Sequence, residues 1–384
     1  MNLNNPDLLA SLLGQQNHPE PETVRTYFHG IFQRQYYTES GPLVRRLERE
    51  IGQLLNVAHI VCVSNPTIAW LMLLEATDFG SGYLLVPTTV PGSLQEALYW
   101  IDRPCQLYDV SSATGYRSQR AYVEAYMNNV AALITVNPWG GACDLHGLKK
   151  LAEEYNVPLF CDSSEAFACC LEKQLIGAWG NAEVFSFEAV NLINGAGGAC
   201  ICTQDEALAD RLRCMRGSGG VIRQVAVSKT VNGRMSEAQA AYALMGLERL
   251  DYWIKRNKIQ HNLYQEILST VPRLRFLSAQ GVNKSNYQQA IIELTMSLEE
   301  KSHLTAYLQQ YRHEAAAFGG ALITNIKHHP VGFCELNSII LSLPLGSRVD
   351  LDCIQVISEA VIEIFMTPAT GPCPTSRPLL QLTL

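Results

Sequence analysis

Short β-forming runs alternate with helical patterns through the first two thirds of the chain, and this order constrains the fold more than any other feature. The runs are His59 to Val63, Leu84 to Pro87, Gln106 to Val110, Ala132 to Val136, Pro158 to Cys161, Glu183 to Phe187 and Ala199 to Cys202. Alternating strands and helices are typical of a mostly parallel sheet covered by helices, because parallel neighbours need a crossover connection. The chain is therefore predicted to be an α/β protein.

Helices are marked by apolar spacing and by capping residues. One predicted helix carries apolar residues at the spacing of a single face, namely Leu145, Leu148, Leu151, Ala152 and Tyr155. Capping boxes that predict helix starts stand at Thr203 with Glu206, Ser236 with Gln239, and Ser297 with Glu300. A long helical stretch from Ser236 to about Leu268 is expected to join two domains.

A chain of 384 residues is expected to form two unequal domains. An apolar share of 47% with 17% charged residues gives enough material for a large core. We expect an N-terminal helical arm over 1–35, a large domain over 36–250 and a smaller C-terminal α/β domain over 251–366. Residues 367–384 are rich in Pro and Thr and are expected to form an extended tail.

Charge and hydropathy exclude several classes of function. The net charge is −7, and the sequence has no basic run, so neither nucleic acid nor an anionic membrane is an expected partner. No apolar stretch reaches the roughly 18 residues of a membrane span, and MNLNNPDLLA lacks signal-peptide features, so a cytoplasmic location is expected. The twelve cysteines include no C-x2-C pair, which favours free thiols over a disulfide framework, and no metal site is predicted.

Polar residues at the ends of predicted strands indicate a ligand site. Asp162 follows PLFC, Ser186 lies within VFSF, and NGAGGA occupies positions 194–199. Ligands of open α/β sheets bind at the carboxyl ends of the strands, where amides and helix starts can hold a phosphate, so a phosphorylated cofactor fits this pattern. Each feature also has a plainer interpretation, because a carboxylate after a strand often caps a helix and glycines often serve a turn.

The order and spacing of longer motifs resemble one family. The motifs are TESGPLVRRLEREIGQLLNVAHIVCVSNPTIAW, NPWGGACDL, FCDSSEAFACC, IGAWGNAEVFSFEAVNLINGAGGACICTQDEALADRLRCMRGSG, NGRMSEAQAAYALMGLERLD and IILSLPLGSRVDLD. Over roughly 300 residues the chain resembles the DegT and StrS sugar aminotransferases, which are fold-type I pyridoxal-phosphate enzymes. The resemblance implies the fold-type I architecture, with a small-molecule substrate.

The resemblance also assigns a cofactor site for pyridoxal or pyridoxamine phosphate. Asp162 matches the aspartate that pairs with the pyridine nitrogen and keeps it protonated. Ser186 and Thr67 match the residues that hold the phosphate, and Asn65, beside Thr67, is assigned to the same site. Asn232 in NGRM matches an asparagine that reaches the phosphate from the partner subunit, which implies a homodimer with shared active sites.

The catalytic lysine of the family is missing. The family lysine follows FSF by four residues, and here FSFEAVN places Asn191 at that position, after Val190. An amide neither forms the Schiff base nor acts as a general base, so conventional transamination is expected to be severely impaired. For Lys229 and Lys173, the two other lysines considered as replacements, a solvated surface position is favoured.

Further departures weaken the expected cofactor site. Pro66 stands where the family has a glycine and has no N–H for a phosphate oxygen. The ring-stacking aromatic is absent, with Val90 or Pro91 in its place, and Glu165 adds a negative charge three positions after Asp162. The segment after His329 is shorter than usual in the family, and His328 and His329 fall where substrate contacts occur, although a loop role is equally expected.

Three functional hypotheses remain open from the sequence. In the first, the protein binds pyridoxal or pyridoxamine phosphate non-covalently and Glu165 or Glu188 moves protons in the biosynthesis of a sugar or secondary metabolite. In the second, it is a cofactor-free pseudoenzyme, a partner subunit or an enzyme with another reaction in the old pocket. In the third, it is a conventional sugar-nucleotide aminotransferase, which the absence of a nucleophile disfavours.

Overall fold

A seven-stranded sheet forms the centre of the larger of two compact units, which comprises residues 17–250 and 279–286. Its strands are β1 (His59–Val63), β2 (Tyr83–Pro87), β3 (Cys105–Tyr108), β4 (Val130–Val136), β5 (Leu159–Asp162), β8 (Ala182–Phe187) and β9 (Gly198–Thr203). The spatial order is β1-β9-β8-β5-β4-β2-β3, and β9 alone runs antiparallel to its neighbours in this sheet. The predicted mostly parallel sheet is confirmed, and β1, β5 and β8 end at the same edge.

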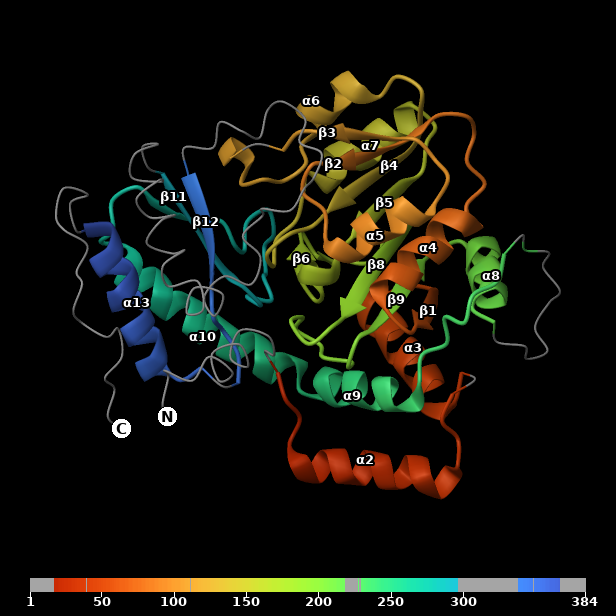
Figure 1. The fold of residues 1–384 in the computed structure, drawn as a ribbon, viewed down its shortest axis with the longest axis horizontal. Coiled ribbons are helices and arrows are strands. Elements are labelled where there is room, and N and C mark those ends of the chain that lie inside the picture. The colour runs from red at the N-terminus through yellow and green to blue at the C-terminus, as the bar shows by residue number, and fades with distance from the viewer. Residues whose placement is uncertain are drawn as a thin grey trace. The chain divides into compact units, whose positions relative to one another are not determined.

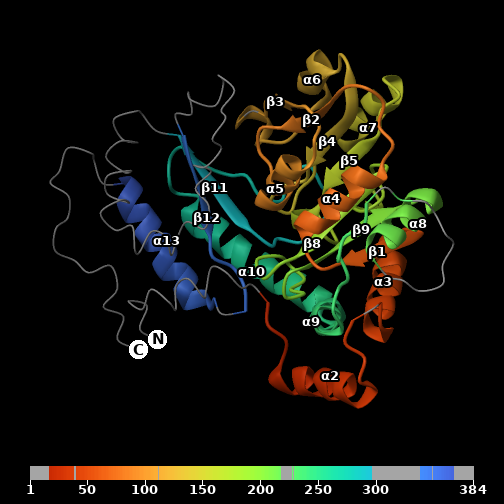
Figure 2. The ribbon, with the colours of Figure 1, turned by 45° about the vertical axis from the view of Figure 1, so that its right-hand side comes forward.

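The computed structural model describes residues 17–38, 40–110, 112–217, 227, 229–295, 338–347 and 349–366. Helices of the larger unit are α2 (Pro21–Arg34), α3 (Pro42–Leu55), α4 (Pro66–Ala76), α5 (Gly92–Trp100), α6 (Arg120–Val123), α7 (Leu145–Glu154), α8 (Glu206–Met215) and α9 (Glu237–Glu248). A short hairpin consists of β6 (Cys170–Leu171) and β7 (Gln174–Leu175). Helix α4 contacts α5, α8, β8 and β9, and α2 lies along α9 (Figures 1 and 2).

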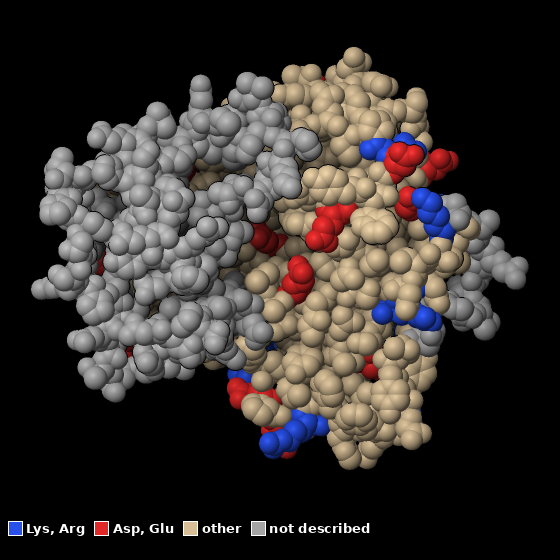
Figure 3. Space-filling model, in the orientation of Figure 1, with Lys and Arg blue, Asp and Glu red and all other residues tan. Residues whose placement is uncertain are grey.

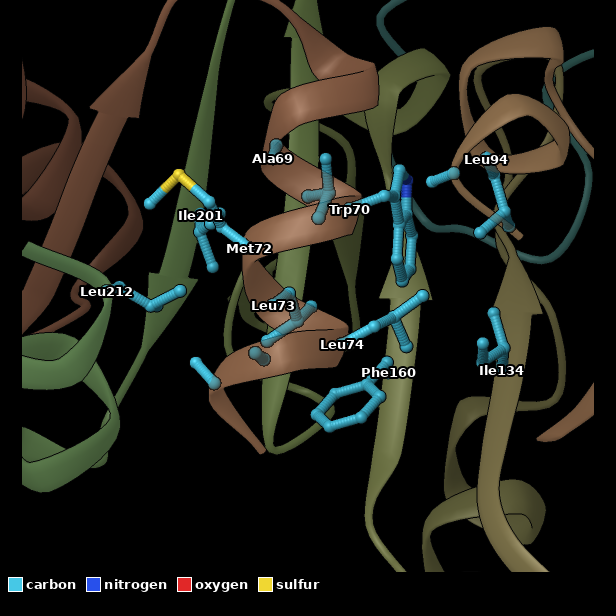
Figure 4. Close-up of a cluster of buried hydrophobic side chains, with 14 of the residues drawn as sticks. Ala69, Trp70, Met72, Leu73, Leu74, Leu94, Ile134, Phe160, Ile201 and Leu212 are labelled. Carbon is cyan, nitrogen blue, oxygen red and sulfur yellow. The ribbon is translucent and has the colours of Figure 1, made fainter. Parts of the chain in front are cut away.

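The core of the larger unit lies between α4 and the sheet. Trp70, Leu73 and Met72 on α4 are fully or almost fully buried and join residues of β4, β5 and β9, among them Ile134, Phe160 and Ile201 (Figure 4). Strands β8 and β9 are buried along their whole length, as expected for strands covered on both faces. Because these strands are packed on both faces, the strand ends at which the candidate site lies are held in place.

The capping patterns predicted one helix start correctly and misplaced another. Ser236 and Gln239 form the expected capping box at α9. The prediction at Thr203 was wrong, because Asp205 caps α8 by accepting from the amide of Leu208, while the Thr203 hydroxyl accepts from the amide of Asp205. The box at 297 and 300 lies outside the described residues.

Two helix predictions also need correction. On α7 the four expected leucine and alanine positions are buried, but Tyr155 follows the helix and is exposed. The single helix expected from 236 to 268 is two helices, because the backbone at Arg249 leaves helical geometry between α9 and α10 (Leu250–Leu268).

A three-stranded antiparallel sheet organises the described part of the smaller unit. Its strands are β10 (Leu274–Phe276), β11 (Ala290–Thr295) and β12 (Ser338–Leu343), in that order, and its helices are α10 and α13 (Leu351–Met366). Tyr264, Ile292 and Ile354 belong to its separate core. The compact units depart from the expected ranges in two places, since 17–35 and 279–286 belong to the larger unit. The expected tail, 367–384, lies outside the described residues.

None of the helices in the described ranges combines the length and the apolar character that a membrane crossing requires. The ten cysteines that the structure describes are free thiols, six of them buried. Within the described residues no cluster of three potential metal-ligating side chains occurs.

Candidate functional site

Asp162 is the last residue of β5 and lies at the sheet edge where β1 and β8 also end. Its side chain is only 2% exposed. Oδ2 accepts a hydrogen bond from the Trp70 indole Nε1 at 2.9 Å, and Oδ1 accepts one from the amide of Ser164 at 3.1 Å. Both oxygens of the predicted coenzyme partner therefore already have donors from this chain.

Burial raises the pKa of the Asp162 carboxyl, because the charged form loses its hydration. The hydrogen bonds from Trp70 and Ser164 act in the opposite direction, and the negative charge of Glu188 adds to the upward shift. The pKa of Asp162 is therefore higher than that of an exposed aspartate.

Asn191 lies in the turn that follows β8, and its side chain is buried at 4% exposure. The turn closes through the amide of Asn191, which donates to the carbonyl of Glu188 at 2.9 Å. Asn17 donates from its amide side chain to the carbonyl of Leu192 at 2.7 Å and so holds the next residue. Asn191 therefore lies in an ordered, enclosed part of the fold.

The glycines after Asn191 serve the β8–β9 hairpin. Gly195 and Gly197 donate from their amides to the carbonyl of Phe187, Gly198 donates to Gly195, and Ala196 donates to the Asn194 side chain. A Cβ at Gly195 would lie 2.7 Å from the Cβ of Phe187, which explains the glycine there. The amides of 195–198 are engaged inside the hairpin, so the interpretation of this loop as a phosphate cradle was wrong and the turn interpretation fits.

Thr67 lies in the first turn of α4, close to the end of β1. Its hydroxyl donates to Glu96 Oε2 on α5 at 2.9 Å. Asn65 caps α4 by accepting from the amide of Ile68 at 2.8 Å, and Pro66 has no N–H. At the start of α4, the Asn65 side-chain oxygen and the amide of Ile68 are therefore already bonded to each other.

Ser186, near the end of β8, is buried, and its hydroxyl donates to Glu188 Oε2 at 3.2 Å. Both hydroxyls expected to hold a phosphate therefore donate to a carboxylate. Neither Glu96 nor Glu188 forms an ion pair with any residue in the described ranges. Figure 3 shows acidic side chains on the described surface around α5, with the Lys and Arg side chains placed elsewhere on that face.

The remaining predicted residues have structural contacts of their own. Glu165 accepts from the amide of Trp139 at 2.6 Å and holds the loop after β4. Asn232 is exposed and accepts from the Arg234 guanidinium at 3.0 Å. Val90, one of the two residues expected in place of the stacking aromatic, packs against the core.

The two lysines weighed as replacements for the missing amine lie at the surface. Lys229 pairs with Glu75 at 2.7 Å, and Lys173 is exposed in the turn between β6 and β7. Glu75 lies near the carboxyl end of α4, two helical turns beyond Thr67. His328 and His329 lie outside the described residues.

Sequence reasoning missed the roles of Trp70 and Glu96. Trp70 follows Thr67 by three positions on α4, so the helical period places both on one face, but a tryptophan in an apolar run also fits a core position. Glu96 lies 29 residues from Thr67 in sequence, and the crossover between α4 and α5 brings the two side chains together. No local pattern signals that contact.

Comparisons with known proteins agree with this architecture. The model of the DegT/DnrJ/EryC1/StrS aminotransferase family matches residues 20–329, and the chain therefore belongs to this family. It is 23% identical over 361 residues to a dTDP-4-amino-4,6-dideoxy-D-glucose transaminase of Shigella dysenteriae, covering 91% of this chain and 98% of that protein.

Solved structures give the same result. The structure of DesI with its TDP-sugar product has a TM-score of 0.80 and 26% identity, with 91% of each chain covered. The PLP form of the sugar aminotransferase-like protein Spr1654 from Streptococcus pneumoniae has a TM-score of 0.77 and 17% identity, covering 92% of this chain and 98% of that one. These matches show the α/β fold of the pyridoxal-phosphate aminotransferases.

The residues present do not fit the coenzyme of this family. Asp162 stands at the expected strand end, but Asn191 supplies no amine and Pro66 supplies no amide. Thr67 and Ser186 donate to carboxylates instead of offering their hydroxyls to an anion. The hydroxyl donors of Thr67 and Ser186 are directed to carboxylates of the protein itself.

Proposed function

We propose that this protein is a member of the sugar aminotransferase family that does not transaminate and that binds a small molecule in the former coenzyme pocket, in the biosynthesis of a sugar or secondary metabolite. The observation that carries the proposal is Asn191, in the enclosed turn after β8. Loss of a covalent nucleophile costs an enzyme several orders of magnitude in rate. The proposal retains the expected cytoplasmic homodimer.

Two forms of this function are supported by different observations. The first, non-covalent binding of pyridoxal or pyridoxamine phosphate, is supported by Asp162 at the end of β5. The second, a cofactor-free pocket, is supported by the hydrogen bonds from Thr67 and Ser186 to Glu96 and Glu188. Two carboxylates beside a phosphate dianion are repulsive, and we favour the cofactor-free form on that ground.

A transamination assay on the purified full-length chain tests the proposal. The chain is incubated with pyridoxal phosphate, 2-oxoglutarate and dTDP-4-amino-4,6-dideoxy-D-glucose, and glutamate formation is followed. A parallel sample is reduced with borohydride and analysed by mass spectrometry. We expect no glutamate above the enzyme-free rate and no added pyridoxyl mass. Steady turnover together with a lysine-linked adduct would overturn the proposal and favour the conventional aminotransferase.

A further inference from the structure

Trp70 is a large core residue placed directly against the predicted coenzyme partner. It lies on α4 and is fully buried. Its ring points from α4 toward Leu94 and Ile134, whereas Met72 and Ile201 lie on the other side of the helix (Figure 4). The indole is thus held by the packing of α4 against the sheet, which fixes the direction of its N–H.

The indole N–H supplies the type of hydrogen bond that a protonated pyridine ring would supply. Nε1 donates to Asp162 Oδ2 at 2.9 Å, which is a normal distance for a strong N–H···O bond. The amide of Ser164 donates to the other oxygen at 3.1 Å. Because the Asp162 side chain is 2% exposed, little of the carboxylate remains open to a further donor.

We infer that the Trp70 indole has replaced the coenzyme ring as the hydrogen-bond donor to Asp162, and that the pocket thereby excludes pyridoxal and pyridoxamine phosphate. The inference deepens the proposed function and rests on it. Trp70 acts as a positioning residue, because it makes Asp162 part of the protein's own hydrogen-bonding network. Glu96 and Glu188 complete the exclusion at the phosphate end by holding the hydroxyls of Thr67 and Ser186.

Two interactions disfavour the coenzyme: the hydrogen bond already made to Asp162 opposes the ring, and the charges of Glu96 and Glu188 oppose the phosphate. A ring donor would compete with a preformed hydrogen bond to a charged group, which is worth about 1.5–3 kcal/mol. At the other end, two like unit charges 4 Å apart repel by about 1 kcal/mol in water and by about 4 kcal/mol near a protein surface. A phosphate dianion meets this repulsion from two carboxylates, without a described Lys or Arg paired to either of them.

Calorimetric titration of the full-length chain with pyridoxamine phosphate tests the inference, since this form needs no lysine. Four proteins are compared: the wild type, Trp70→Phe, the double variant Glu96→Gln with Glu188→Gln, and Trp253→Phe. Trp253→Phe is the matched control, because Trp253 is a buried indole on α10 of the smaller unit. Circular dichroism and thermal melts establish that each variant is folded.

We expect no saturable binding by the wild type or by Trp253→Phe. Trp70→Phe keeps an aromatic ring and removes the N–H, so it frees Asp162 and is expected to bind at least tenfold more tightly than the wild-type value or detection limit, about 1.4 kcal/mol. The double glutamine variant is expected to gain affinity as well. Saturable binding by the wild type, or no gain in a folded Trp70→Phe protein, would overturn the inference.

A second measurement on the wild type does not depend on a variant. The chain has five tryptophans, so a spectrum with nitrogen-labelled indoles is simple enough to follow single N–H signals. The Trp70 signal is expected to exchange slowly with solvent and to stay in place when pyridoxamine phosphate is added. A signal that moves in a saturable manner contradicts the inference. Reversible binding without turnover would leave the proposed function intact, whereas turnover with a lysine adduct would overturn that function itself.

Discussion

Two buried carboxylates on neighbouring strands differ in how readily the sequence reveals them, yet resemble each other in the structure. Glu183, at the start of β8, is fully buried and accepts from the Ser163 hydroxyl at 2.5 Å and the amide of Trp179 at 2.6 Å. Asp162, at the end of β5, accepts from Trp70 and the amide of Ser164. Each carboxylate receives donors from its own chain at both oxygens, as a structural acid does.

Because Asp162 and Glu183 are bonded in the same way, the position of Asp162 at a strand end does not by itself make it a ligand-binding group. A carboxylate that awaits a ligand keeps one oxygen open to it, whereas Glu183 has no such opening and Asp162 has very little. The two carboxylates still differ in where they lie in the sheet. Asp162 ends β5 at the sheet edge near which Ser186 and Thr67 also lie, while Glu183 holds the turn before β8.

The largest expected effect comes from truncating the structural member of the pair. Glu183→Ala leaves the Ser163 hydroxyl and the amides of Trp179 and Gly180 without their acceptor, at about 1–3 kcal/mol for each buried donor. We expect the free energy of unfolding to fall by about 3 kcal/mol or more, measured by urea denaturation. The matched control, Glu153→Ala on an exposed position of α7, is expected to change stability by less than about 0.5 kcal/mol.

The next largest effect tests whether Asp162 stabilises the fold in the way that Glu183 does. In Asp162→Asn one of the two donors, from Trp70 or Ser164, faces an amide NH2 group instead of an oxygen. A structural Asp162 predicts a loss of about 1–3 kcal/mol in the free energy of unfolding. Unchanged stability, combined with a loss of pyridoxamine phosphate binding that the wild type possesses, would separate the two carboxylates and restore Asp162 as a coenzyme partner.

A smaller effect is expected from pH. Burial raises the pKa values of both Asp162 and Glu183 above their ordinary values of 3.8 and 4.5, so the folded state holds these protons more tightly than the unfolded state. Stability contributed by each proton is present below the ordinary value and is lost as pH rises through the raised pKa. The urea midpoint of the wild type, measured from about pH 4 upward, is expected to fall relative to that of Glu183→Gln as pH rises, because the glutamine side chain has no proton to lose. Parallel curves would show that Glu183 does not titrate in this way.

The fold was predictable because it depends on patterns that repeat along the chain. The seven strand runs were placed within about two residues, since buried parallel strands are continuous apolar segments bounded by turn residues. Local capping chemistry was less secure, as the change from Thr203 to Asp205 at α8 shows. Both residues are good caps, and the choice is made by the hydrogen bond of Thr203 to the carbonyl of Asn181.

The site was predictable only in its positions. The resemblance placed Asp162, Ser186, Thr67 and Asn191 near one sheet edge or its adjoining turn, but it did not indicate what their side chains contact. Those contacts depend on long-range partners, such as Glu96 for Thr67, that no local spacing encodes. Tertiary partners therefore decide whether a family position still binds a ligand or has become part of the fold.

The smallest expected effect concerns Lys229, the lysine weighed as a replacement for the missing amine. Lys229 lies at the surface and pairs with Glu75 at 2.7 Å, and exposed pairs of this kind contribute about 0–1 kcal/mol. Lys229→Ala is therefore expected to leave stability nearly unchanged and to leave the borohydride-trapping result of the wild type as it is. Lys173→Ala serves as the control from another exposed turn. If the wild type traps pyridoxal phosphate and Lys229→Ala alone abolishes the adduct, an amine from outside the β8 turn forms the Schiff base, and the proposal that this chain does not transaminate is contradicted.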